Sequence, residues 1–331
     1  MTVTQNLLKL LKPRSDVEVD TPRVEVDAKE LRRALLEIIP ECHKFHLLDV
    51  NPYGKVYKAY HRSLNRIVAV KLVRCINADG TTTATNTYTC DGRGPPKDFT
   101  ILQSISHPHV LEILSVYRGG TGETTNIISE FMTGDTLLEY SQVVFRKQRA
   151  EGCRLGLAEI VGRDIMYQLC QAMAYVHRLG IVHRNLKLEN IFLTGDTIPF
   201  IKVAGFGLAA HVPDGGFLTE PRGSIDYMSP EMVRESSYGY DFLADSWSVG
   251  VLLAELLLLD NAYTTRRTLP EFTLPPFRWA ELRDGRISAE GIELLEMLLA
   301  PDPALRYSIA AALQHKWLMY HRPMYPNVLY P

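Results

Sequence analysis

The sequence predicts an α+β fold built in two parts, with a β-rich part followed by a helix-rich part. Short runs rich in β-branched and aromatic residues, separated by turn residues, fill residues 45–73. From residue 160 onward, apolar residues recur instead at the spacing of amphipathic helices. The chain has 331 residues, of which 46% are hydrophobic, and it is therefore long enough to bury a sizeable core.

The start of the chain is predicted to form an extension ahead of the sheet. Residues 1–26 contain prolines and alternate valine with acidic residues, which is typical of an extended lead-in. Asp27 is placed to cap a helix over residues 28–39, which Pro40 would end. We therefore expect residues 1–44 to be an N-terminal extension with one short helix.

Five strands are expected after this extension. They are predicted over residues 45–48, 54–60, 66–72, 110–116 and 126–131. Between the third and the fourth strand, residues 76–96 contain six threonines and end in a Pro95-Pro96 pair. This stretch lacks the apolar side chains that would order it, so a loop followed by a short helix is expected there.

The second part of the chain is predicted to be helical. Apolar-periodic segments of ordinary helix length cover residues 160–179, 244–259, 290–299 and 308–318. The longest apolar stretch, residues 249–259, includes Glu255 and is far shorter than the roughly 20 residues that span a bilayer. No internal repeat is apparent, so a membrane span and a repeat architecture are both disfavoured.

The bulk properties exclude several classes of function. A net charge of -2 gives no electrostatic footprint for nucleic acid. The five cysteines are scattered without paired metal-ligand spacing, which argues against zinc and disulfide frameworks and suits a reducing compartment. We therefore expect an intracellular, cytoplasmic protein that binds neither nucleic acid nor membrane, and nothing in the sequence argues against the nucleus.

Six motifs occur in a specific order along the chain. They are Val68-Ala69-Val70-Lys71, His183-Arg184-Asn185-Leu186-Lys187-Leu188-Glu189-Asn190, Gly205-Phe206-Gly207, Ser229-Pro230-Glu231, Asp245-Ser246-Trp247-Ser248-Val249-Gly250 and Asp302-Pro303-Ala304-Leu305-Arg306. A single motif of this kind is common, but the order is specific. Over residues 45–318 the chain resembles the eukaryotic protein kinases, and among them the Ser/Thr kinases of the calmodulin-dependent or energy-sensing type.

That resemblance implies a two-lobed protein-kinase-like fold, with a small antiparallel β lobe and a larger helical lobe. Residues 45–132 would form the kinase-like N-lobe and residues 133–318 the kinase-like C-lobe. Residues 319–331 would be a short C-terminal tail. In this family the nucleotide lies between the lobes, and the strand lysine, here Lys71, holds its α and β phosphates.

The resemblance also implies a set of nucleotide-binding positions. Val56, Ala69 and Phe192 match the positions that enclose the adenine. The complete set is Leu48, Gly54, Val56, Ala69, Lys71, Glu130, Met132 and Phe192. Asp98 falls where the family has a glutamate that orients the lysine, and two interpretations stay open: a partner of Lys71, or a cap of the helix that follows Pro96.

The phosphate-binding loop departs from the family pattern. The family has Gly-x-Gly-x-x-Gly, because glycine lets backbone N–H groups approach the phosphates. This chain has Asp49-Val50-Asn51-Pro52-Tyr53-Gly54 and keeps the last glycine alone. Asp49 brings a like charge toward a triphosphate, and Pro52 lacks an N–H donor. A weaker grip on phosphate is therefore expected.

Two further departures concern the chemistry itself. Asn185 stands where the family has its catalytic aspartate, and Gly205 stands where it has a metal-binding aspartate. An amide cannot act as a base near neutral pH, and glycine offers a metal no side-chain ligand. Lys187 remains as the γ-phosphate lysine, and Asn190 remains as a metal ligand.

Other matching positions have structural or regulatory roles in the family. The stacked spine and its anchor correspond to Leu102, Ile113, His183, Phe206 and Asp245, and a buried ion pair corresponds to Glu231 and Arg306. Arg184 would bind either a phosphate on Thr219, the candidate phosphosite, or the carboxylate of Glu220. Ser224 matches the Ser/Thr form of the substrate loop. Residues 260–286 depart from the family pattern and are a candidate partner surface.

The resemblance and its departures together predict a pseudokinase. It would act as a scaffold or allosteric regulator of a partner protein, with an active kinase among the candidates. ATP binding would be weak, and a complete magnesium site is not expected. The alternative is a weakly active or atypical ATP-dependent Ser/Thr kinase that holds its metal through Asn190 alone, which Lys71, Lys187 and Ser224 favour. A third possibility is a decaying paralogue without a present function.

Overall fold

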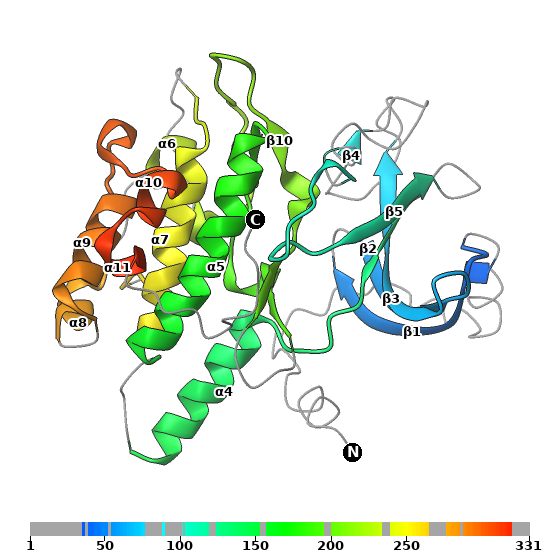
Figure 1. Cartoon of the computed structure of the whole chain (residues 1–331), viewed down its shortest axis with the longest axis horizontal. Coiled ribbons are helices and arrows are strands. Elements are labelled where there is room, and N and C mark those ends of the chain that lie inside the picture. Colours follow the sequence, from blue (N-terminus) through cyan, green and yellow to red (C-terminus); the bar gives the residue numbers. More distant parts are fainter. Residues whose placement is uncertain are drawn as a thin grey trace, which may run out of the picture.

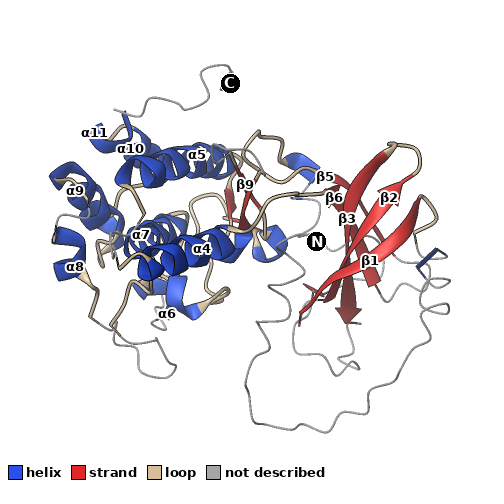
Figure 2. Cartoon of the chain, turned by 90° about the horizontal axis from the view of Figure 1, so that it is seen from below, coloured by secondary structure: helices blue, strands red, loops and turns tan. Residues whose placement is uncertain are grey.

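A sheet and a helical body lie side by side in the computed structural model (Figures 1 and 2). The structure describes residues 35–36, 39–51, 54–76, 88–89, 101, 103–118, 124–152, 157–194, 200–233, 239–264, 276–284 and 287–319. Figure 2 shows the sheet at one end of the molecule and most of the helices at the other. The chain enters the sheet first and crosses to the helical body after the last strand of the sheet.

The five predicted strands are present in one antiparallel sheet. They are β1 (Cys42–Asn51), β2 (Gly54–His61), β3 (Arg66–Ile76), β5 (Ile113–Arg118) and β6 (Thr124–Glu130), in the spatial order β1-β2-β3-β6-β5. In addition, β4 (Tyr88–Thr89) pairs in parallel with the end of β3. The prediction of a loop throughout residues 76–96 is therefore wrong at Tyr88–Thr89, where the backbone pairs with β3.

One face of the sheet carries its own apolar cluster. Successive strand residues point to opposite faces, and Tyr57 and Ala59 of β2 are buried on this face. Leu35 and Ile39 pack in the same cluster. Residues 35–36 are helical, and the rest of the helix predicted over residues 28–39 lies largely outside the described residues. The opposite face of the sheet is thereby left to the helical body.

The helical body is built around one fully buried helix. Its helices are α4 (Leu137–Ala150), α5 (Glu159–Arg178), α6 (Pro230–Val233), α7 (Leu243–Leu258), α8 (Trp279–Arg283), α9 (Ala289–Leu298), α10 (Ile309–Leu313) and α11 (Lys316–Met319). Every residue of α7 after Leu243 is buried, as expected of a helix that is apolar on all sides. Among the described residues, no helix combines the length and apolar character that a bilayer span requires.

Three of the four predicted helices are confirmed as α5, α7 and α9, with ends shifted by one residue. The fourth, predicted over residues 308–318, is divided into α10 and α11. The division occurs because the Nδ1 atom of His315 accepts a hydrogen bond from the backbone N–H of Trp317 at 3.3 Å and starts a second helix. The sequence interpretation missed α4, whose start is marked by a capping box between Thr136 and Glu139.

Two short antiparallel strand pairs flank the loops that lie between the lobes. β7 (Ile181–Val182) pairs with β10 (Ala210–His211), and β8 (Ile191–Leu193) pairs with β9 (Ile201–Val203). The backbone N–H of Val203 also donates to the carbonyl of His109 at 2.8 Å. These pairs hold the ends of the loops 183–190 and 204–209, so that both loops face the sheet.

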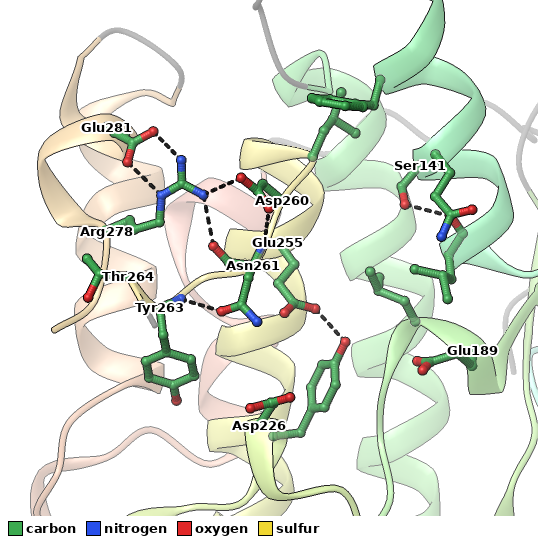
Figure 3. A pocket seen from close by; sticks show the side chains of 16 residues that line it. Ser141, Glu189, Asp226, Glu255, Asp260, Asn261, Tyr263, Thr264, Arg278 and Glu281 are labelled. Carbon is green, nitrogen blue, oxygen red and sulfur yellow. Dashed lines mark hydrogen bonds and ion pairs between the residues drawn. The ribbon is translucent and has the colours of Figure 1, made fainter. Parts of the chain in front are cut away.

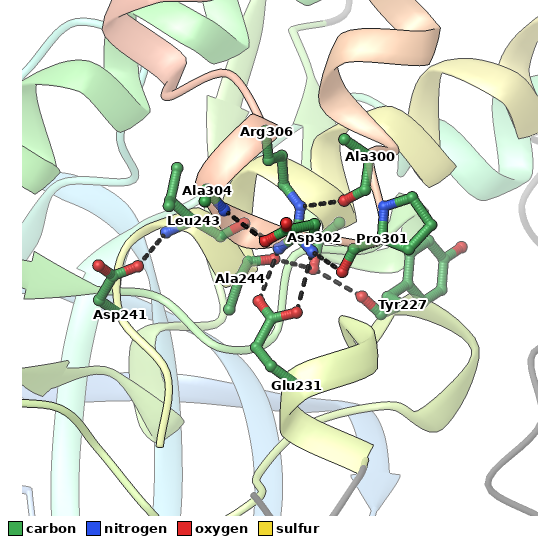
Figure 4. A network of polar contacts seen from close by, with 11 residues as sticks. Tyr227, Glu231, Asp241, Leu243, Ala244, Ala300, Pro301, Asp302, Ala304 and Arg306 are labelled. Atoms are coloured by element: carbon green, nitrogen blue, oxygen red, sulfur yellow. Dashed lines mark hydrogen bonds and ion pairs between the residues drawn. The ribbon is translucent and has the colours of Figure 1, made fainter. Parts of the chain in front are cut away.

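A buried ion pair joins distant segments of the helical body (Figure 4). Arg306 donates to both carboxylate oxygens of Glu231, at 2.6 and 2.9 Å, and its side chain is wholly buried. The guanidinium also donates to the carbonyls of Ala300 and Leu243 and lies 5.2 Å from the centre of the Trp247 ring. A paired and fully hydrogen-bonded charge of this kind is costly to break from one side.

Candidate functional site

A buried carboxylate fixes the loop that carries the predicted catalytic residues. Asp245 lies in the first turn of α7 and accepts hydrogen bonds from the backbone N–H groups of His183, at 2.8 Å, and Arg184, at 2.9 Å. The Nε2 atom of His177 lies 2.9 Å from the same carboxylate. Burial would raise the pKa of Asp245, but the hydrogen bond and the charge of His177 outweigh it and lower that pKa.

His183 links this loop to the Gly205 loop. Its Nε2 atom lies 2.9 Å from the carbonyl oxygen of Ala204, and its ring packs edge-on against Phe206 with 4.5 Å between centroids. Burial lowers the pKa of His183, so the ring is neutral near neutral pH. Ile113 packs on the same core, whereas Leu102 lies outside the described residues. His183 and Phe206 are thus in ring contact, and the assignment of these residues to a stacked spine stays a prediction.

A cavity of about 570 Å³ lies between the sheet and these loops. All the predicted nucleotide-binding positions except Gly54 line it, and so do the predicted catalytic and metal positions. The lining residues from these sets are Leu48, Val56, Ala69, Lys71, Glu130, Met132, Phe192, Asn185, Lys187, Asn190 and Gly205. Gly54 instead pairs with Asn51 where β1 meets β2. Asp98, the candidate partner of Lys71, lies outside the described residues.

Several residues that line the cavity were not assigned to it in the sequence interpretation. Glu189 is the one with a charge, and Leu111, Ser129 and Phe131 add to the walls. Glu189 directly precedes Asn190, so its position in the loop was the available signal. The three wall residues lie within the two predicted strands, but their place at the cavity depends on how β5 and β6 pair in the sheet, which a single sequence does not reveal.

Asn185 and Asn190 are bonded to each other within the loop. The side-chain Nδ2 of Asn190 donates to the backbone carbonyl of Asn185 at 2.7 Å. The side-chain Oδ1 of Asn185 lies 3.4 Å from the hydroxyl of Ser224, at the outer limit of a hydrogen bond. Asn185 therefore presents an amide beside the Ser224 hydroxyl, and an amide has no basicity to offer there.

Gly205 leaves a space that the Asn190 side chain fills. Its φ is +86°, in the left-handed region that favours glycine. A Cβ at this position would lie 2.4 Å from Cγ of Asn190 and 2.7 Å from its Oδ1. The Asn190 amide therefore occupies the volume that a side chain at position 205 would need.

The charged groups of the cavity are balanced against one another. The Nζ of Lys187 lies 3.7 Å from the Glu189 carboxylate. The Glu130 carboxylate lies 2.6 Å from the Nζ of Lys202 and also accepts the backbone N–H of Glu112 at 2.8 Å. Burial lowers the pKa of Lys71, and the negative charge of Asp49 opposes that shift.

These residues do not fit the magnesium site that the resemblance implies. Mg²⁺ prefers oxygen ligands in octahedral geometry, usually with one or two carboxylates. Gly205 supplies none, Glu189 is paired with Lys187, and Asn190, whose Nδ2 donates to Asn185, offers one amide oxygen and no carboxylate. Within the described ranges, no group of three or more His, Cys, Asp or Glu side chains converges to hold a metal ion.

The predicted phosphosite lies outside this cavity on an exposed segment. Thr219 is exposed, and the neighbouring Glu220 pairs its carboxylate with Arg222. Arg184 has a φ of +65° and directs its guanidinium to the carbonyl of Leu208 and, at 3.4 Å, to the hydroxyl of Tyr240. The expected pairing of Arg184 with the Glu220 carboxylate is not among these contacts, and the carboxylate pairs with Arg222 instead.

A second cavity, of about 850 Å³, lies in the helical body (Figure 3). Arg278 binds the carboxylates of Asp260 and Glu281 on one side of it. On another side the hydroxyl of Tyr227 donates to the carboxyl of Glu255. Burial raises the pKa of Glu255 to about 7, with a smaller opposing effect from the Tyr227 hydrogen bond. The described part of residues 260–286 thus forms one wall of this cavity.

The chain is similar to known proteins over most of its length. A family model described as "Protein kinase domain" matches residues 51–318. The serine/threonine-protein kinase RAD53 of Saccharomyces cerevisiae is 28% identical over 284 residues, which cover 80% of this chain and 31% of the relative. The serine/threonine-protein kinase ULK3 of Mus musculus is 32% identical over 282 residues, which cover 83% and 54%. The chain therefore spans between about a third and about a half of the length of these relatives.

A solved structure shares the fold. The crystal structure of the Rad53 kinase domain and SCD2 in complex with AMPPNP aligns with a TM-score of 0.58 at 25% identity. The alignment covers 83% of this chain and 89% of that chain. The two-lobed α+β fold that the sequence predicts is thereby confirmed.

We expect the stability of the protein to fall as the pH rises through the titration of Glu255. The folded protein keeps this proton up to about pH 7, whereas the ordinary value of 4.5 applies to the unfolded chain. Between these values the folded state binds more protons, so the free energy of unfolding decreases with pH, by at most about 1.4 kcal/mol per unit. Urea denaturation at pH 5 and pH 8 measures this change.

The Glu255→Gln variant should lose this part of the pH dependence, because glutamine does not titrate. The matched control is Glu296→Gln, which removes a half-exposed carboxylate paired with Arg283. It should keep the pH dependence of the wild type. An identical change between pH 5 and pH 8 in the wild type and Glu255→Gln would show that the buried carboxyl does not titrate in this range.

We expect the Gly205→Asp substitution to destabilise the fold. The side chain must adopt a left-handed φ, which costs about 1–2 kcal/mol, and must displace the Asn190 amide from its hydrogen bond, which adds about 1 kcal/mol. Gly152→Asp is the matched control, because Gly152 has a φ of +72° but no described atom within 4 Å of an added Cβ. Equal losses in the two variants, measured by urea denaturation, would contradict the close packing at Gly205.

Proposed function

Because the chain belongs to the protein kinase domain family, we propose that it is a pseudokinase. It keeps the two-lobed frame of the family, transfers phosphate at a trace rate or not at all, and acts by binding a partner protein. The partner is one that a kinase-like surface can scaffold or regulate, with an active kinase as one candidate. The protein works inside the cell and binds ATP weakly.

The state of the catalytic loop carries this proposal. The amide of Asn185 faces Ser224, Gly205 has no side chain, and Asn190 is bonded to Asn185 across the space that Gly205 leaves. Loss of a general base typically lowers the rate by about 10²–10⁴-fold. Loss of the charge stabilisation that a metal provides adds several kcal/mol to the barrier. Even if these effects overlap, a family rate of about 1–100 per second would fall to a trace.

The retained packing supports a binding role. Asp245, His183 and Phe206 keep the loops in place, and Glu231 and Arg306 keep the helical body together. A protein that keeps its folded structure but lacks the residues for catalysis can still bind a partner as a scaffold. Residues 260–286, where the sequence departs from the family pattern, remain the candidate partner surface.

Weak ATP binding is supported by the cavity and by the solved neighbour. The Rad53 kinase domain is a complex with AMPPNP, an analogue of ATP. Here the corresponding apolar walls and Lys71 line one cavity, which favours some affinity for the nucleotide. Asp49 in the loop and the pairing of Lys187 with Glu189 oppose a tight grip on its phosphates.

The alternative function is a weakly active Ser/Thr kinase. Lys71, Lys187 and Asn190 all line the cavity, and the relatives reported above are Ser/Thr kinases. A thermal shift with ATP, with and without magnesium, separates the two functions, because a ligand at 100 times its dissociation constant stabilises by about 2.7 kcal/mol. A large shift that requires magnesium would favour the kinase.

We expect purified protein to show no phosphate transfer above background. The assay supplies labelled ATP and magnesium and measures transfer to the chain itself and to generic serine and threonine peptides. Lys71→Ala is the control, because it removes the lysine that the resemblance assigns to the α and β phosphates. Transfer near about 1–100 per second that Lys71→Ala abolishes would overturn the pseudokinase proposal.

A further inference from the structure

The strand register places a carboxylate in the same row as the cavity lysine. Asp49 of β1 is the cross-strand partner of Val56 in β2, and Val56 is the cross-strand partner of Lys71 in β3. Residues directly opposite one another in a sheet project from the same face. All three residues line the cavity between the lobes. The Asp49 carboxylate and the Lys71 ammonium therefore face the same space.

The spacing of this row allows the two charges to interact. Neighbouring strands lie about 4.8 Å apart, so about 10 Å separates the backbones of β1 and β3. The four-carbon stem of a lysine can cover much of this distance across a small residue such as Val56. Asp49 is the charge that opposes the burial effect on the pKa of Lys71. The carboxylate thus acts electrostatically on the ammonium that, by the resemblance, would hold the nucleotide phosphates.

The second lysine of the cavity also has an acidic neighbour. The Nζ of Lys187 lies 3.7 Å from Glu189, and both residues line the cavity. The lining includes three carboxylates, on Asp49, Glu130 and Glu189, and two ammonium groups, and Glu130 is paired with Lys202, which does not line the cavity. A triphosphate would bring several more negative charges into this space, and like charges brought together in a binding site cost several kcal/mol.

The remaining walls suit an uncharged ligand. Most are apolar side chains, contributed by both lobes: Leu48, Val56, Ala69, Leu111, Met132 and Phe192. A cavity of about 570 Å³ falls within the range of small-molecule sites. Apolar walls on two sides favour a flat heterocycle, whose faces can be desolvated without loss of hydrogen bonds.

We propose that Asp49 takes the place of a nucleotide phosphate beside Lys71, so that the cavity prefers an uncharged adenosine-like heterocycle to a nucleoside triphosphate. Asp49 is then the residue that determines ligand specificity. This preference rests on the proposed function, because a working kinase would have to bind the triphosphate productively. It extends that function by giving the pseudokinase a small-molecule ligand of its own.

Isothermal titration calorimetry of the whole chain with adenosine, ATP, and ATP with magnesium tests the preference. For the wild type we expect adenosine to bind at least about tenfold more tightly than ATP, a difference of about 1.4 kcal/mol. For Asp49→Asn, which removes the charge and keeps the shape, we expect ATP to bind about tenfold more tightly than to the wild type. Adenosine affinity should stay within about threefold of the wild type, because its contacts are with the apolar walls.

Asp214→Asn is the matched control, since Asp214 is exposed and does not line this cavity, and it should change neither affinity. Circular dichroism checks that each variant is folded, and Asp49→Ser replaces Asp49→Asn if that variant is not. Tighter binding of ATP than of adenosine by the wild type, no adenosine binding, or no effect of Asp49→Asn on ATP would each overturn the proposal.

The phosphate-transfer assay gives an independent result. Tight ATP binding without transfer would overturn the ligand preference and leave the pseudokinase proposal standing. Transfer at a family rate by a protein that still prefers adenosine would overturn the pseudokinase proposal instead. The two failures are therefore distinguishable.

Discussion

The contact on which the rest of the site depends is the buried carboxylate of Asp245. It accepts the backbone N–H groups of His183 and Arg184 and lies 2.9 Å from the Nε2 of His177. His177 belongs to α5, and His183 and Arg184 belong to the loop beneath the cavity. One side chain of α7 therefore fixes the position of that loop relative to α5. The His183 ring in turn packs against Phe206 and so helps to fix its position. Removing one partner of such a buried charge is strongly destabilising, because the charge is then left uncompensated.

The buried residues that keep the loops and the helical body in place form what we call the frame. The charged residues that line the cavity form the phosphate site, and the two sets are stabilised by different kinds of contact. Asp245 and Arg306 of the frame are buried and hydrogen-bonded, Asp245 to His183 and Arg306 to Glu231. The charged residues of the cavity are partly exposed and balance one another in pairs, as Lys187 and Glu189 do. We therefore expect changes of these charged side chains to cost less stability than changes in the frame. This separation explains how a chain can keep the fold of a catalyst while Asn185 stands at the position of the base.

The sequence predicted the architecture well, because apolar periodicity and the motifs can be read from short stretches of residues. The five antiparallel strands and the helices α5, α7 and α9 follow from them directly, whereas β4 does not. Helix α4 was missed because its apolar stripe is short, and only Leu137 and Ser141 are buried in it. The row that joins Asp49 to Lys71 requires the strand register, and the Asn190 amide beside Gly205 requires the loop geometry. Neither is encoded in local spacing.

If the frame and the phosphate site are separable, substitutions in them will have unequal effects on folding. The most direct measurement is the free energy of unfolding of Asp245→Asn and Lys71→Met by urea denaturation. An asparagine offers one acceptor oxygen and turns an N–H₂ donor toward a backbone N–H, so we expect Asp245→Asn to lose more than about 3 kcal/mol. Lys71→Met keeps the apolar stem and should change stability by less than about 1 kcal/mol. A loss in Lys71→Met as large as that in Asp245→Asn would contradict the separation.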